Sequence, residues 1–426
     1  MYTIYELIKI TLSNIYFTYK KQEVLCTKKY CKNIDITNRD LISNATYNCL
    51  AEKYERNDTL ELLSDISGLR KCQIYNIYYR YGRKAIIPFV EVLITVIHLE
   101  LINKSITYPQ IWYKDKSDPS SHKVRHIGIQ HVKQQIYDYI TIEGLKPLFC
   151  RIGVHQYASI RDRGCLKGSH MIQRWMRNKS LKYFAKLDIR KCYPSIPQNQ
   201  LIQFLEKHIK NNMLMWLIKE LVNSFEQGLS IGSFLSQYLC NLYLSQIYHF
   251  IGHLHKVRKH KDGTKSSIRL VYHRLFYMDD ILMVGTSSKD MHKAVKEVIK
   301  YCKSLGLKIK ESWFVKKMPF AKKCDGSFID MMGFRIYRTH ITIRRRVFKR
   351  IRRIAIRIWK KIKTHQKVLE SHARKMISYW GLLKNSNSVK VIQKYHIKDI
   401  IKISKKVVKE YDKISLYGKT ATCIGC

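Results

Sequence analysis

Short apolar runs separated by polar turns characterise the middle of the chain. Residues 274–285, RLFYMDDILMVG, hold two such runs on either side of the adjacent acids Asp279 and Asp280. Apolar runs of this length around a short polar turn predict two antiparallel strands with both acids at the turn. The run KYFAKLDI, residues 182–189, predicts another strand that ends near Asp188. A hairpin tip would aim Asp279 and Asp280 into one small volume, where divalent cations would offset their repulsion.

Both ends of the chain show helical patterns instead. Residues 1–105 are rich in Tyr, Ile and Lys and predict helices without a recognisable motif. The apolar run at 85–102 contains two glutamates and a histidine, so we expect a buried helix rather than a membrane span. Within residues 344–363, isoleucines recur at helical spacing and leave basic residues on the other faces. The basic residues on those faces include Arg346, Arg350, Arg353 and Arg357.

Charge narrows the classes of partner. The 426 residues include 79 Lys and Arg against 32 Asp and Glu, a formal net charge of +47. With 46% hydrophobic residues the chain can still bury a core, which excludes a disordered basic tail. Its length suggests two or three domains, or one large enzyme with appendages. Nucleic acid fits this charge better than a membrane surface, because basic residues run through the whole chain.

Cysteine usage and the first residues bear on localisation. The 12 cysteines follow no disulfide framework, and the start MYTIYELIKI lacks the pattern of a signal peptide. We therefore expect reduced thiols and a cytoplasmic protein. The tail CIGC has metal-ligand spacing, but it lacks an obvious second pair of cysteines, which argues against a zinc site.

Three acids on neighbouring strands have a specific chemical use. Carboxylates suit Mg²⁺, and Asp188, Asp279 and Asp280 could hold two Mg²⁺ ions, with Mn²⁺ as the alternative. Two such ions activate an attacking hydroxyl and stabilise the leaving oxygen in a phosphoryl displacement. Together with the basic charge, this predicts nucleotidyl transfer on nucleic acid. The ordinary alternative is that these aspartates only cap helices or form turns.

Several segments occur in an order that resembles one enzyme family. Tyr277-Met278-Asp279-Asp280 resembles the YxDD box of reverse transcriptases. Other segments that resemble boxes of this family are KVRHIGI (123–129), LDIRKCYPSI (187–196), GLSIGSFLSQ (228–237), MMGFRIYRTHITIRRR (331–346) and SYWGLLKNSNS (378–388). The Ser-Gln ending of the 228–237 segment is similar to that of diversity-generating-retroelement enzymes and of related bacterial defence enzymes. The resemblance extends over residues 120–390.

The resemblance implies a fold and a division into domains. The fold class would be α+β, a right-hand polymerase with fingers, palm and thumb. A helical N-terminal extension would occupy residues 1–105, and the fingers and palm residues 106–340. A helical, basic thumb with a C-terminal tail would occupy residues 341–426.

The resemblance also implies roles for residues of the catalytic centre. Asp188, Asp279 and the carbonyl of Ile189 would bind metal, with Asp280 as a weaker ligand. Tyr193 would lie under the sugar as a steric gate that selects deoxynucleotides, and its ordinary alternative is a core aromatic. The other nucleotide-binding residues would be Lys123, Arg125 and Gln237. Lys308 or Lys310 would protonate the leaving pyrophosphate, and the sequence leaves that choice open.

A further set would contact the template and primer. Its members are Gly228, Gly232, Tyr277, Met278, Arg161, Arg163, Arg346, Arg350 and Arg353. The glycines would permit close approach of the backbone, and the arginines would bind phosphates. For the basic helix, the alternative is an ordinary solvated face.

The expected reaction is template-directed addition of dNTPs to a 3′-hydroxyl. The expected partners are an RNA template that is a cognate non-coding RNA, a DNA primer and product, and dNTPs. A partner protein or a second copy of the chain could also dock, and no membrane is expected. The N-terminal extension favours antiviral (anti-phage) defence. The alternatives are a mutagenic diversity-generating-retroelement enzyme and, in another class, an idle RNA-binding scaffold derived from a polymerase.

Overall fold

A computed structural model describes residues 29–117, 124–318 and 328–423, with side chains through residue 412. The chain divides into two compact units. The first comprises Met1–Thr59, Glu91–Ile152 and Ile196–Leu239, and the second Leu60–Val90, Gly153–Ser195 and Cys240–Cys426. Both helices and strands are present, which agrees with the α+β class.

Helices dominate residues 39–102. They are α2 (Arg39–Leu50), α3 (Asn57–Ser67), α4 (Lys71–Tyr81), η1 (Arg83–Ile86) and α5 (Ile87–Ile102). Arg83–Ile102 is the one stretch of the described residues that is long and apolar enough to span a membrane, which is weak evidence for a span. Val90 and Ile94 are fully buried, whereas Val92 and Leu99 are about half exposed. The helix expected to be buried is therefore buried along one side only.

The first unit is built around α6. Helix α6 spans Val132–Leu145. Besides α2 and most of α5, the unit contains β1 (Trp112–Ser117), β2 (Val124–Ile129), η2 (Lys146–Arg151), α9 (Gln198–His208) and α10 (Asn212–Asn223). Helix α6 packs against α2 and α10 and buries residues on most of its sides. Strands β1 and β2 pair antiparallel, with Trp112 opposite Ile129.

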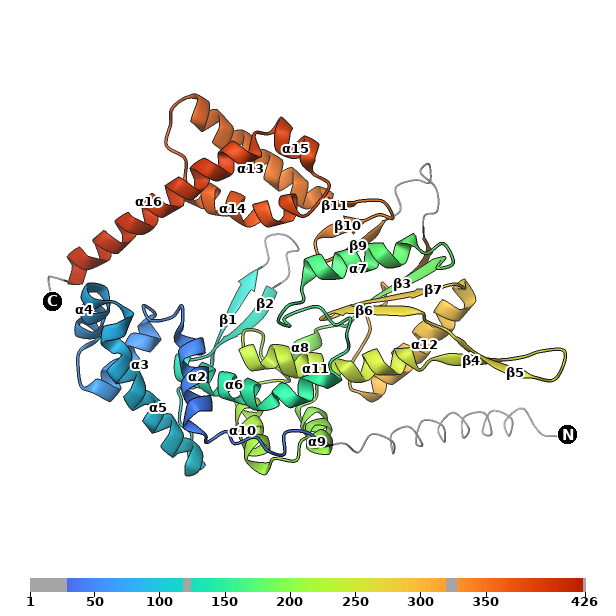
Figure 1. Cartoon of the computed structure of the whole chain (residues 1–426), viewed down its shortest axis with the longest axis horizontal. Helices are drawn as coiled ribbons and strands as arrows, with labels where there is room; N and C mark the ends of the chain where they lie inside the picture. The colour runs from blue at the N-terminus through green and yellow to red at the C-terminus, as the bar shows by residue number, and fades with distance from the viewer. Residues whose placement is uncertain (1–28, 118–123, 319–327, 424–426) are drawn as a thin grey trace. The chain divides into compact units, whose positions relative to one another are not determined.

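A four-stranded antiparallel sheet forms the centre of the second unit, with strand order β6-β7-β3-β8. The strands are β3 (Tyr183–Asp188), β6 (His273–Tyr277), β7 (Asp280–Gly285) and β8 (Phe314–Lys317). Helices α7 (Cys165–Arg177) and α12 (Ser288–Ser304) lie on opposite sides of this sheet (Figure 1).

Side-chain alternation explains the two layers on this sheet. Phe184 and Val284, which are opposite each other in register, belong to one apolar cluster with Trp175 of α7. On the other face, a Cβ added at Gly285 would lie 2.6 Å from Sδ of Met291 in α12. Since successive strand residues point to opposite faces, both faces of β3 and β7 are covered.

The C-terminal part of the second unit contains a small sheet and a helical bundle. Its elements are β9 (Ile329–Met331), β10 (Phe334–Ile336), β11 (Ile341–Ile343), α13 (Arg345–Lys363), α14 (Glu370–Lys384), α15 (Val389–Lys394) and α16 (Ile397–Cys423). Ile351 and Ile358 of α13 are fully buried, and Ile354 and Ile362 pack against the same cluster. The isoleucine pattern thus predicted this amphipathic helix correctly.

Four further elements complete the described chain. They are α8 (Cys192–Ser195), α11 (Phe234–Gly252), β4 (His255–Lys259) and β5 (Lys265–Arg269). Helix α11 runs from the first unit into the second, where its apolar residues are buried. Strands β4 and β5 form a separate two-stranded sheet.

Candidate active site

The three predicted acids meet at one end of the central sheet. Tyr277 pairs with Asp280 across a two-residue turn made of Met278 and Asp279. Asp188, the last residue of β3, lies opposite Asp280 in the register of β3 and β7. The expectation of two strands around this turn is confirmed, but Asp280 opens β7 instead of lying in the turn.

The turn is strained at its first residue. Met278 has a φ of +51°, a left-handed conformation that is costly for a residue with a Cβ. Two-residue turns between hairpin strands favour positive φ angles, which is why glycine or asparagine is common at these turn positions. The main-chain N–H of Ile189 donates to the carbonyl of Asp279 at 3.0 Å, so the turn is tied to the end of β3.

Electrostatics at this end of the sheet is set by the crowded acids. The pKa of Asp279 is raised, mainly because the side chain is partly buried, and then because Asp188 and Asp280 are negatively charged. Lys310 forms an ion pair with Asp188, and Lys186 one with Asp280 at 3.3 Å. Two lysines therefore neutralise the acids where a divalent cation would otherwise do so.

The donor set fits Mg²⁺ by its chemistry, because it consists of crowded carboxylates. The residues that could hold such an ion are Asp188, Asp279 and Asp280, with the main-chain carbonyl of Ile189. Within the described residues, no group of three His, Cys, Asp or Glu side chains is already arranged around a metal position. A metal ion would compete with the two lysines for the same oxygens.

Tyr193 lies beside the turn that carries the acids. Its hydroxyl donates to Sδ of Met278 at 3.7 Å, and Nδ2 of Asn241 lies 3.8 Å from the same sulfur. Burial raises the pKa of the Tyr193 phenol, so it remains protonated. The structure thus brings the predicted gate residue to the turn that carries the acids, and its role in sugar selection stays a prediction.

A buried polar network that sequence reasoning missed supports this turn from α11. Nε2 of Gln156 donates to the carbonyl of Asn241 at 2.8 Å, and Nδ2 of Asn241 donates to the carbonyl of Ala158 at 3.0 Å. Phe276 in β6 exchanges main-chain hydrogen bonds with the same segment, at His155 and Tyr157. The only sequence signal was an asparagine within the apolar run of α11.

Arg161 and Arg163, predicted to bind phosphates, have different surroundings. The guanidinium of Arg163 donates to the carbonyls of Gly153 and Gln156 at 2.6 and 2.8 Å. The Arg161 side chain is 95% exposed. Arg163 therefore fixes the fold of its own loop, whereas Arg161 faces solvent.

In the first unit, two predicted motifs meet. The N–H of Gly128 in β2 donates to the carbonyl of Ile231 at 2.9 Å. Gly232 has a φ of +125°, and a Cβ there would lie 2.4 Å from the carbonyl oxygen of Gly128. A Cβ at Gly128 would lie 2.2 Å from Oγ of Ser230. The close backbone approach therefore requires glycine at position 232, whereas at Gly128 the Ser230 hydroxyl occupies the space that a side chain would need.

Other predicted residues of this unit lie close to that contact in sequence. Gly228 has a φ of +56°, and its carbonyl accepts from Nε2 of Gln198 at 3.0 Å. Gln237 is half-buried in the first turn of α11. Arg125 is exposed on β2, and Lys123 lies outside the described residues. Arg125 and the three acids belong to different units.

A buried carboxylate holds the start of α11. Oδ2 of Asp138 accepts from the hydroxyl of Ser233 at 2.9 Å and from the N–H of Leu235 at 3.3 Å. The hydroxyl of Ser233 accepts from the N–H of Ser236, so Ser233 caps the helix. Burial raises the pKa of Asp138 to about 6.

The predicted basic residues of α13 lie away from its buried stripe. Arg346 and Arg353 are exposed, and Arg350 is half-exposed. Lys310, one of two candidate acids, contacts Asp188, whereas Lys308 is exposed.

Comparison with known families agrees with this geometry. Residues 114–323 match the family model of reverse transcriptase (RNA-dependent DNA polymerase), which supports a reverse transcriptase and the right-hand polymerase fold. The match includes Asp188, Asp279 and Asp280. No curated protein matches the chain.

Proposed function

We propose that the chain is an RNA-directed DNA polymerase that copies a cognate non-coding RNA into DNA and serves in defence against phage. One observation carries the polymerase part of this proposal. Asp188, Asp279 and Asp280 converge at one end of a sheet, within the segment that matches reverse transcriptases. A chain without catalytic function has no use for three crowded carboxylates in a strongly basic protein.

The chain's own groups would divide the work. Asp188, Asp279 and Asp280 would hold Mg²⁺, which when bound activates the 3′-hydroxyl and stabilises the leaving oxygen. Tyr193, held against Met278, would exclude a 2′-hydroxyl by contact.

Lys310 has the geometry of a proton donor at this site. Its ammonium contacts Asp188 and carries a proton that a departing pyrophosphate could accept. Lys308 is exposed and engages the loop only through its carbonyl, which accepts from the N–H of Arg190. We therefore assign the acid role to Lys310.

Two features support the cognate RNA and the defence role. They are the Ser-Gln ending at Ser236–Gln237, which is similar to that of bacterial defence enzymes, and the helices that precede the polymerase segment. A mutagenic retroelement enzyme is the alternative, and sequencing of the product distinguishes the two. Product copied from a dedicated structured RNA supports defence, and product copied with errors from a repeat beside a variable gene supports the alternative.

The test is incorporation of labelled dNTPs by the purified chain with its co-purifying RNA and Mg²⁺. Asp279→Asn should reduce incorporation to background, because it removes one charge without changing shape. Asp65→Asn is the matched control, since Asp65 is an exposed residue of α3. Equal activity of the Asp279→Asn variant would exclude the proposed site. Bound RNA without incorporation, even on an added primer–template, would support the scaffold alternative.

A further inference from the structure

The β4–β5 hairpin is a ribbon with both faces in water. Its strands pair from His255 opposite Arg269 to Lys259 opposite Lys265. Val257 is 67% exposed, and Ile268 is half-exposed. An isolated two-stranded hairpin is marginally stable, because it lacks a hydrophobic face of its own. Such a ribbon is better suited to contacting a partner than to supporting the fold.

The ribbon is strongly basic. Its exposed cations are Arg258, Lys259, Lys261, Lys265 and Arg269. Across the described residues, none of the five lies within ion-pair distance of a carboxylate. Its one acid, Asp262, accepts from the N–H and hydroxyl of Thr264 and so shapes the turn. The charge is therefore available to an external anion.

An ion pair attaches the ribbon to α12. Nζ of Lys256 donates to both carboxylate oxygens of Asp290 at 2.7 Å. Asp290 is in the first turn of α12 and is only 8% exposed. The N–H of Leu270 also donates to the carbonyl of Leu254, which closes the base of the ribbon. The ribbon thus has a fixed place beside the first turn of α12.

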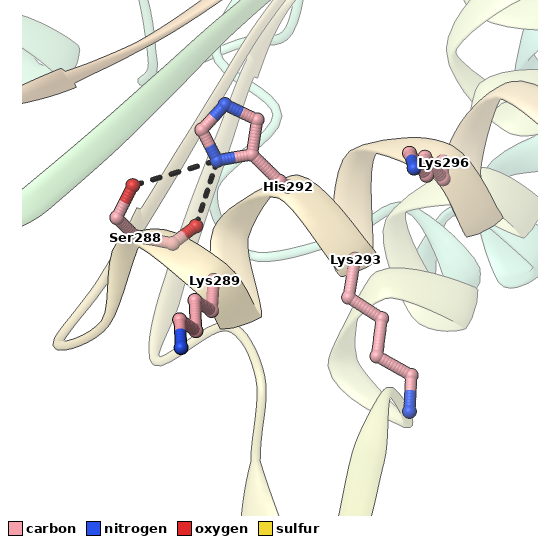
Figure 2. Close-up of a pocket in the computed structure, with 5 residues that line it drawn as sticks. All are labelled: Ser288, Lys289, His292, Lys293 and Lys296. Atoms are coloured by element: carbon pink, nitrogen blue, oxygen red, sulfur yellow. Dashed lines mark hydrogen bonds between the residues drawn. The ribbon is translucent and has the colours of Figure 1, made fainter.

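Helix α12 continues the basic surface. Its exposed Lys and His residues, most of them three or four positions apart, are Lys289, His292, Lys293, Lys296, Lys300 and Lys303, of which Lys300 pairs with Glu297 at 3.4 Å. This spacing places them on one face of the helix. Ser288, Lys289, His292, Lys293 and Lys296 line a shallow pocket that contains no carboxylate, and the side chain of Lys293 extends away from the helix axis (Figure 2). We call the ribbon and this face of α12 the ribbon–α12 surface.

The ribbon–α12 surface is separate from the acids. Asp188 and Asp280 share a sheet face with Phe184 and Val284, which pack toward α7, whereas α12 covers the other face. Along the chain, the ribbon leads into β6 at His273, whereas Asp279 and Asp280 follow the other end of β6, after Tyr277. Five strand residues span about 16 Å.

We propose that the ribbon–α12 surface binds the phosphate backbone of a double-stranded stem in the template RNA, and so retains the RNA while another part of it is copied. This inference rests on the proposed function for the identity of the RNA. Cations along a ribbon and a helix suit a backbone that presents regularly spaced phosphates. A protein partner would need an apolar centre, and the exposed Val257 is too small for one.

The test measures binding of the full chain to a 20-base-pair RNA hairpin over a range of salt concentrations. Two variants remove charge from the two halves of the surface. They are Arg258→Gln/Lys259→Gln/Lys265→Gln and Lys289→Gln/Lys293→Gln/Lys296→Gln. The matched control is Lys32→Gln/Lys207→Gln/Lys210→Gln, which removes the same charge from exposed positions of the first unit.

Each surface variant should weaken binding about tenfold or more at physiological salt. It should also reduce the slope of log Kd against log salt by about two to three, because about three phosphate contacts are lost. The control should change both quantities by less than a third as much. Amide hydrogen exchange in residues 255–269 should slow when RNA is bound to the wild type. Since all substituted side chains are exposed, thermal unfolding should be unchanged.

The outcomes separate this inference from the proposed function. Extension of a short, pre-annealed primer–template should stay within about twofold of wild type in the surface variants. Affinity equal to that of the control variant would overturn the inference while leaving the polymerase intact. An equal loss for a DNA duplex of the same sequence would overturn the assignment to RNA. Absence of extension in every variant and in wild type would count against the proposed function alone.

Discussion

Asp138 has a completely buried carboxylate, and Asp138→Asn should stabilise the protein at neutral pH. Burial raises its pKa to about 6, although hydrogen bonds from Ser233, Leu235 and Gln130 favour the ionised form. The folded protein therefore binds a proton that the unfolded chain has already released between about pH 4 and 6. Because the pKa is raised on folding, stability decreases as the pH rises through this window.

The structure gives the magnitude of this effect. The difference between a pKa of about 6 and an ordinary value near 4 corresponds to about 3 kcal/mol, reached above pH 6. Asparagine would avoid this cost and could still accept from Ser233 and Leu235. Its new N–H donors would face Gln130, whose buried Oε1 has no hydrogen-bond partner among the described atoms. The Gln130 amide could turn to accept one of them.

Urea unfolding of both proteins between pH 4.5 and 8 tests this reasoning. The advantage of Asp138→Asn should grow to about 2–3 kcal/mol at pH 7.5 and vanish toward pH 4. Asp138→Ala is the control: it lacks the same carboxyl, so its stability relative to wild type should rise with pH in parallel with that of Asp138→Asn. It should be about 1–3 kcal/mol less stable than Asp138→Asn at every pH, because Ser233 and Leu235 lose their acceptor. A pH-independent difference between Asp138→Asn and wild type would show that the ionised form is not costly here. Equal stability of the asparagine and alanine variants would show that the hydrogen bonds from Ser233 and Leu235 contribute little.

Three further predictions concern single positions. Gly232→Ala should lower the free energy of unfolding in urea by about 3 kcal/mol, since the new Cβ would lie against a carbonyl oxygen. Gly263 also has a positive φ but has open space around it, so Gly263→Ala should cost only about 1–2 kcal/mol. Equal costs would contradict the steric argument. Lys310→Met should lower the half-saturating Mg²⁺ concentration for polymerisation several-fold while lowering kcat, and an unchanged Mg²⁺ dependence would mean that this lysine does not compete. Arg163→Ala should lower the free energy of unfolding by about 2–3 kcal/mol and Arg161→Ala by less than 0.5 kcal/mol, and the reverse order would refute the loop-fixing role.

Local pattern was enough to predict the strands that carry the acids. The two short apolar runs on either side of Asp279 and Asp280 predict the hairpin, and the run before Asp188 predicts β3. The pattern alone could not decide which two residues form the turn. That choice depends on the positive φ of Met278, which makes Met278 the first turn residue. Asp280 therefore begins a strand, directly opposite Asp188, although the sequence placed it in the turn.

Contacts between distant segments could not be predicted from the sequence. Gly232 was identified from its own segment, but the reason that it must be glycine is the carbonyl of Gly128, which lies against it in the folded chain. Arg163 was predicted to bind phosphates. The two carbonyls that accept from its guanidinium, those of Gly153 and Gln156, become its neighbours only in the folded loop, so the sequence did not reveal them. Residues 255–267 are basic and polar in the sequence, but only the structure shows that they form a ribbon with both faces in water.

Lys186, one of the two lysines at the acids, links β3 to β9 and, through Asp330, to the start of the helical bundle. Lys186 pairs with Asp280 and donates to the carbonyl of Asp330 in β9 at 3.0 Å. The side chain of Asp330 in turn pairs with Arg344, the residue before α13. A cation that binds Asp280 weakens its attraction for Lys186 and leaves that lysine to the β9 carbonyl. If a metal ion binds there, its binding and the anchoring of β9 would share one side chain, and a change at either would affect the free energy of the other.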